Sequence, residues 1–175
     1  MILNFSTEIL GKPSLFPEKI WSGFKETQIC LELSQYIHSK FSQFDNVNFS
    51  DLIPKIHTIR LDIQDRWSAG IPIHFGIKAR TPDYIQFAPI IPVVSTQRIV
   101  ITKEKHTGFL TYRRQVVIDN KLLGQAIYAK GKLIKSNHSV DLLALNDGFD
   151  NTEDFFEYFD GPYKGKIIHW TNKRY

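Results

Sequence analysis

Residues 54–60 read Pro-Lys-Ile-His-Thr-Ile-Arg, and residues 66–70 read Arg-Trp-Ser-Ala-Gly. The first stretch brings together an amine (Lys55), a hydroxyl (Thr58) and a guanidinium (Arg60) at the start of a segment whose pattern predicts a strand. The Trp-x-x-Gly of the second stretch predicts a turn into another strand. Two cations around a hydroxyl suit either the gripping of an anionic or nucleoside ligand or the activation of the hydroxyl as a nucleophile.

On the N-terminal side of this motif the pattern is helical. Apolar residues four apart predict a short helix from Phe16, closed near Gly23, and a second helix over residues 26–41. Pro54 then ends any preceding helix and starts the motif strand, because a residue before proline disfavours the helical conformation.

On the C-terminal side the pattern indicates mostly strands. Asp119-Asn120 is a hairpin signal, and residues 151–154 resemble a capping box that opens a helix. A further short helix is expected over 140–145, ended at Gly148. The predicted strands cover residues 1–10, 71–77, 97–102, 109–118, 122–123 and 166–170. Short strands with helices at both ends predict an α+β fold, a small β-barrel with helical decoration.

Composition fits one globular domain over residues 1–175. The 42% hydrophobic share supports a packed core, and the single Cys30 excludes an intrachain disulfide framework. The first residues lack the basic and apolar regions of a secretory signal, and no apolar run approaches the ~18 residues that span a bilayer. We therefore expect a cytoplasmic protein with no membrane partner.

The formal net charge of +4 is unevenly distributed. Residues 98–135 hold nine basic and two acidic side chains, whereas residues 141–160 hold seven acidic and no basic ones. This separation is compatible with a polyanionic partner such as RNA on the basic side. It is equally compatible with two solvated faces that compensate each other.

The order of motifs resembles a known family. A short helix ending in Gly (17–23) precedes Lys-x-x-Thr-x-Arg, a Trp-x-x-Gly strand follows, and Ala-x-x-Asp-Gly-Phe-Asp-x-x-Glu-Asp-Phe spans 144–155. Over most of its length the chain resembles the ASCH domain of the PUA-like superfamily, in particular uncharacterised ASCH-type proteins of bacterial and phage genomes. The resemblance implies a small β-barrel with a cleft beside the motif strand.

The resemblance also implies functions. ASCH domains are thought to bind RNA or nucleotides, and some small bacterial members are amidohydrolases that deacetylate acetylated cytidine. Their functional Lys and Thr match Lys55 and Thr58, their Glu falls near Asp147, and the motif arginine matches Arg60. In a hydrolase Thr58 would be the nucleophile, Lys55 its base, Asp147 the group that orients Lys55 or the ligand amine, and Arg60 the holder of a carbonyl or phosphate oxygen.

The chain departs from the family pattern in two places. Residues 24–54 separate the helix from the motif and predict a helical insertion. Lys25, in Gly-x-Lys, is an alternative motif lysine, but Lys55 keeps the spacing to Thr58 and Arg60. Asp147 would also reach about one methylene less far than the family's Glu.

Cations beside aromatic residues are typical of nucleic-acid binders, in which bases stack on rings. Arg66, Trp67 and Arg80 fit this pattern, and Gln86 offers an amide to a base edge. The alternative for Trp67 is a place in the core.

The leading prediction is therefore an RNA- or nucleoside-binding ASCH domain. The alternatives are a hydrolase of an acylated nucleoside and a protein-interaction module, such as one that a phage directs at a host factor through the inserted helices. The six histidines show no ligand spacing, and phosphate loops, dinucleotide fingerprints and serine nucleophile elbows are missing. The sequence thus predicts no metal and no cofactor.

Overall fold

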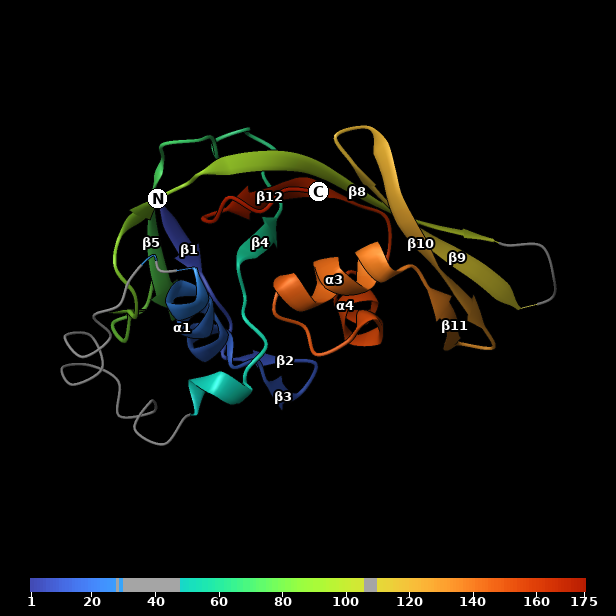
Figure 1. The fold of residues 1–175 in the computed structure, drawn as a ribbon, viewed down its shortest axis with the longest axis horizontal. Helices are drawn as coiled ribbons and strands as arrows, with labels where there is room; N and C mark the ends of the chain where they lie inside the picture. Colours follow the sequence, from blue (N-terminus) through green and yellow to red (C-terminus); the bar gives the residue numbers. More distant parts are fainter. Residues whose placement is uncertain (28, 30–47, 106–109) are drawn as a thin grey trace.

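The computed structural model describes residues 1–27, 29, 48–105 and 110–175. Its largest feature is an antiparallel sheet with strand order β11-β10-β9-β8-β12-β4. Figure 1 shows this sheet arching over two C-terminal helices, so that it closes part of a barrel. Its strands are β4 (His57–Arg60), β8 (Ser95–Lys105), β9 (Thr111–Ile118), β10 (Lys121–Ala129), β11 (Lys132–Ser136) and β12 (Tyr163–His169).

A second, smaller sheet lies beside helix α1 (Phe16–Glu26), as Figure 1 shows. Here β1 (Ile2–Asn4) pairs in parallel with β5 (Pro72–Ile77), which also pairs with β6 (Ile85–Gln86) and β7 (Ile91–Pro92). Phe5 stacks on Phe75 at a centroid distance of 6.0 Å and meets the edge of Trp170. Phe16 and Phe24 of α1 contact this aromatic core, which packs α1 against the small sheet. A separate hairpin joins β2 (Glu8–Ile9) and β3 (Lys12–Pro13), and a 3-10 turn, η2, covers Phe49–Asp51.

Helices α3 (His138–Asn146) and α4 (Thr152–Tyr158) pack into the concave face of the large sheet. The predicted cap of α4 is confirmed, since the Asn151 side chain accepts a hydrogen bond from the Asp154 N–H at 2.8 Å. The predicted hairpin is also confirmed. Asp119 and Asn120 join β9 to β10 with φ of 49° and 66°, the left-handed conformation that a tight hairpin turn requires.

Two predicted boundaries were wrong. Helix α1 does not close near Gly23 but continues to Glu26. Gly23 serves close packing instead, since a Cβ there would lie 2.8 Å from the backbone oxygen of Lys55. The motif strand begins at His57 and not at Pro54. Lys55 therefore lies in the connection before the strand, where side chains need not alternate between the two faces of the sheet.

The predicted fold class agrees with the structure, but some strands were not predicted. The α+β class and a curled sheet compatible with a barrel are confirmed. The sequence missed β11 and most of β10. The predicted helix over 26–41 and most of the 24–54 insertion lie outside the described residues. Among the described residues, no helix is long and apolar enough to cross a membrane.

Candidate functional site

The motif lysine and the aspartate of the α3–α4 turn form a buried ion pair. The Lys55 amine lies 2.8 Å from Asp147 Oδ1 and also donates to the Asp147 backbone oxygen. The two residues are only 1% and 3% exposed. The structure thus brings these two predicted site residues into direct contact, despite the shorter reach of aspartate.

Backbone contacts position this pair between α1 and the α3–α4 turn. The Lys55 N–H donates to the Lys19 oxygen at 2.9 Å, and the Ile56 N–H donates to the Asn146 oxygen at 3.0 Å. The Lys19 amine in turn donates to the Gly148 oxygen at 2.8 Å. Two lysines therefore hold the carbonyls of Asp147 and Gly148, just after the end of α3.

Gly148 leaves the room that the lysine needs. Its φ of +90° is a left-handed conformation that side chains rarely adopt. A Cβ there would lie 2.9 Å from Lys55 Cδ and 3.0 Å from Phe16 Cε1. The Asp-Gly pair therefore supplies both the carboxylate and the space beside it.

Burial pushes both members of the pair toward their neutral forms. It lowers the pKa of Lys55 to about 8, although the Asp147 carboxylate opposes this shift. Burial also raises the pKa of Asp147, against the opposing effect of the Lys55 amine. An amine that titrates near neutral pH can exchange a proton with a ligand far more readily than an ordinary lysine.

Arg60 and Lys55 meet at one aromatic ring. The Arg60 guanidinium lies 5.1 Å from the centre of the Phe5 ring, and the Lys55 amine lies 5.9 Å from it. Arg60 also donates to the Asn4 backbone oxygen at 2.9 Å. The turn before β4 thus brings the two motif cations near each other.

Thr58 lies in β4 opposite Ile168 and is 2% exposed. In the described part of the chain, the Lys55 amine donates to Asp147 and not to the Thr58 hydroxyl. The hydrogen bond through which a base activates a nucleophile is therefore not made in this structure. The neighbouring His57 packs against His169 at 5.5 Å, and burial lowers its pKa well below the usual value, so it is a neutral core histidine.

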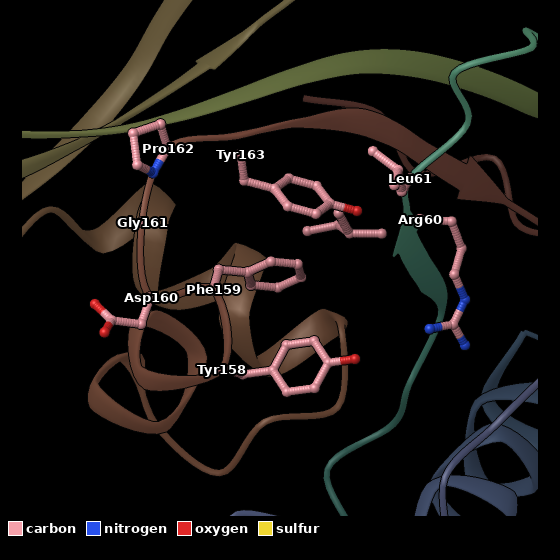
Figure 2. A pocket seen from close by; sticks show the side chains of 9 residues that line it. Arg60, Leu61, Tyr158, Phe159, Asp160, Gly161, Pro162 and Tyr163 are labelled. Carbon is pink, nitrogen blue, oxygen red and sulfur yellow. The ribbon is translucent and has the colours of Figure 1, made fainter.

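A cavity of about 420 Å³ opens beside the motif strand. Arg60 lines one side, and Tyr158, Phe159 and Tyr163 line the other. Figure 2 shows the hydroxyls of Tyr158 and Tyr163 pointing across the cavity toward the side on which Arg60 lies. A volume of this size, with aromatic walls and one cation, suits a small planar ligand.

Ile59 connects the buried pair to this cavity. Its N–H donates to Asp147 Oδ1 at 3.1 Å, and the residue itself lines the cavity. The Lys55–Asp147 pair therefore lies directly behind the cavity wall and fixes the position of β4. The motifs of the sequence did not predict the wall residues Tyr158, Phe159 and Tyr163, although an aromatic run lies just after the Asp-Gly-Phe motif.

The other predicted ligand contacts lie apart from this cavity. Arg66, Trp67 and Arg80 line a second hollow of about 470 Å³, although Trp67 itself is only 6% exposed and packs into the core. Gln86 lines neither hollow, and its amide donates to the Ala88 oxygen at 3.2 Å. Of the two candidate motif lysines, Lys55 is the one that lies beside Asp147, whereas Lys25 is exposed and lies above the Phe49 ring.

The fold and site define a mixed α+β protein, built mainly of strands, with an aromatic cavity beside a buried lysine–aspartate pair. No protein-family model, curated protein or solved structure matches the chain significantly. Within the described ranges, no three His, Cys, Asp or Glu side chains gather where they could hold a metal ion. The function is therefore inferred from the chemistry of the site.

Proposed function

We propose that the protein binds a nucleoside, free or within RNA, in the cavity between β4 and α4. The observation that carries this proposal is that Arg60 lies on one side of a cavity of about 420 Å³ and the rings of Tyr158 and Tyr163 lie on the other. Every nucleobase has a π-face that stacks on tyrosine, and each also carries ring nitrogens or carbonyl oxygens that accept hydrogen bonds from a guanidinium. The resemblance of the motif to ASCH domains supports the same ligand class.

The exposure of the wall residues favours access by a ligand. Tyr158 is 45% exposed, so its ring can receive a base without any change of the core. Phe159 is 6% exposed and contacts the Tyr163 ring at 4.8 Å, which gives the cavity a rigid floor. Because the Lys55–Asp147 pair holds Ile59, the opposite wall is also fixed before the ligand arrives.

Binding is favoured over hydrolysis by burial. Lys55 and Thr58 are 1% and 2% exposed, so neither meets a ligand in this arrangement. One observation nevertheless supports hydrolysis of an acylated nucleoside as a second candidate: burial lowers the pKa of Lys55 to about 8, which suits a general base. In that case the wall at Ile59 would have to move before Thr58 could be activated.

The test is calorimetric titration of the protein with cytidine, uridine, adenosine and acetylated cytidine. Tyr158→Ala is expected to weaken binding roughly 5- to 150-fold, since stacking of a base on a ring contributes about 1–3 kcal/mol. Tyr158→Phe keeps the ring and is the matched control, with affinity close to that of the wild type. Equal affinities for Tyr158→Ala and the wild type would refute the cavity as the binding site.

The same mixtures distinguish hydrolysis from binding. Mass spectrometry after incubation with acetylated cytidine is expected to show the substrate intact, as befits a binding protein. Release of acetate by the wild type but not by Thr58→Val would establish the hydrolase instead, because valine keeps the shape of threonine and removes only its hydroxyl.

A further inference from the structure

We infer that the hollow lined by Arg66, Trp67 and Arg80 binds a phosphate group of the ligand, which makes that ligand a nucleotide or a single-stranded nucleic acid. This inference rests on the proposed nucleoside cavity and adds a second contact, between the arginines and a phosphate of the same ligand. The hollow has a volume of about 470 Å³ and is also lined by Asn4 and Ala79.

The two arginines at this hollow have free donors. Arg66 has a side chain that is 64% exposed and approaches Asp62 only at 4.0 Å. Arg80 is exposed and makes no ion pair with any other described residue. Each guanidinium offers a planar fork of N–H groups, the geometry that matches two phosphate oxygens.

The nearby carboxylates Asp62 and Asp65 already have partners. Asp62 accepts hydrogen bonds from the backbone N–H groups of Arg66 and Trp67 at 3.0 and 2.9 Å. The Lys166 amine also lies 3.3 Å from the Asp62 carboxylate. The same amine lies 2.5 Å from Asp65. Lys166 thus offsets one of these two negative charges, and the two arginines leave the surroundings of the hollow with a net positive charge.

Asn4 links the hollow to the nucleoside cavity. Its backbone oxygen accepts from Arg60, which lines the cavity, and its side-chain oxygen accepts from the Ala79 N–H at 2.8 Å, next to Arg80. Arg60 therefore stands between the two sites. A base stacked on Tyr158 and a phosphate between Arg66 and Arg80 would place Arg60 along the connecting sugar and phosphate, as a groove for a single strand does.

The test compares two double variants that remove the same charge. Arg66→Ala/Arg80→Ala removes two exposed arginines of the hollow, whereas Lys132→Ala/Lys135→Ala removes two exposed lysines of β11, at the opposite edge of the large sheet from β4. Both are titrated with cytidine, cytidine 5′-monophosphate and a five-residue oligocytidylate at several salt concentrations.

The arginine variant is expected to bind the oligocytidylate roughly tenfold more weakly. It is also expected to flatten the plot of log affinity against log salt by about 0.7, since the loss of one phosphate contact on a single strand removes about 0.7 from the slope. The lysine variant should match the wild type. Equal losses in both variants would overturn the inference, because the attraction would then be a property of net charge alone. No loss in either variant would also overturn it, because the two arginines would then make no contact with phosphate.

Cytidine separates this inference from the proposed function. Both double variants should bind cytidine as the wild type does. If cytidine binds but neither phosphorylated ligand binds more tightly, the phosphate site is refuted and the nucleoside cavity stands. If cytidine does not bind and the oligocytidylate depends on the two arginines, the phosphate site stands without the cavity. A gain already present with the monophosphate identifies a nucleotide, and a gain confined to the oligocytidylate identifies the phosphodiester backbone.

Discussion

The amine of Lys55 lies 2.8 Å from the carboxylate of Asp147, 92 residues later in the chain, and both side chains are buried. This contact ties the connection before β4 to the turn between α3 and α4. Because Asp147 also accepts the Ile59 N–H, the pair sets the position of the strand that forms one wall of the cavity. Its removal should therefore affect both stability and binding.

Breaking the pair from either side should be costly. Lys55→Met leaves a buried carboxylate without its cation and is expected to lower the free energy of unfolding by about 3–5 kcal/mol. Asp147→Asn keeps the oxygen that accepts the Ile59 N–H but removes the charge that pairs with Lys55. The double variant should lose less than the sum of the single losses, by about 1–3 kcal/mol. Urea denaturation of the four proteins measures this coupling, and additive losses would show that the ion pair is energetically irrelevant.

The lowered pKa of Lys55 makes stability depend on pH. The folded state releases this proton near pH 8, whereas the unfolded state holds it up to 10.5. Between these values the unfolded state binds more protons, so Lys55 makes unfolding less favourable as the pH rises. The free energy of unfolding of the wild type relative to Lys55→Met should therefore increase from pH 7.5 to 10, by at most about 3 kcal/mol. A constant or falling difference would contradict the assignment.

Gly148→Ala should destabilise the protein more than strain at positive φ alone would. Gly131 provides the comparison, since its φ of +79° is similar and nothing lies within 4 Å of an added Cβ. Gly131→Ala is expected to cost about 1 kcal/mol from backbone strain. Gly148→Ala adds the collision with Lys55 and Phe16, worth about 1–3 kcal/mol more. Thermal denaturation of both variants checks this order, which equal shifts in melting temperature would contradict.

Gly23→Ala tests the packing of α1 against the motif. Helix propensity alone predicts that alanine stabilises this helix by about 0.5–1 kcal/mol. The added Cβ would instead lie 2.8 Å from the Lys55 backbone oxygen, so we expect a net loss of stability of about 1–3 kcal/mol. A melting temperature above that of the wild type would mean that α1 and residue 55 can separate freely.

The sequence predicted those elements whose signals are local. The hairpin at Asp119-Asn120 and the cap at Asn151 depend on neighbouring residues only, and both were confirmed. Strand β11 was missed because its apolar alternation is short, with Ile134 65% exposed at the edge of the sheet. The predicted end of α1 was wrong because Gly23 does not end the helix. It allows the backbone of Lys55, which is distant in the chain, to pack closely against α1.

The candidate site shows the same division. Spacing along the chain selected Lys55 and Arg60, but nothing in the sequence could show that the fold buries Lys55 and Thr58 and leaves Arg60 at a cavity. Nor could spacing separate the hollow of Arg66 and Arg80 from that cavity. These features depend on how the two sheets meet, which is a property of tertiary packing.

The most direct test of the proposal that the cavity beside β4 binds a nucleoside is an NMR titration of the protein with selectively labelled tyrosine rings. Cytidine should shift the signals of Tyr158 and Tyr163, which line the cavity, and leave that of Tyr112 unchanged, since Tyr112 lines a separate pocket against Tyr128. Saturable shifts confined to the first two rings are the predicted result. Binding that leaves both rings unperturbed, or that shifts Tyr112 instead, would contradict the proposal that this cavity is where the protein holds its ligand.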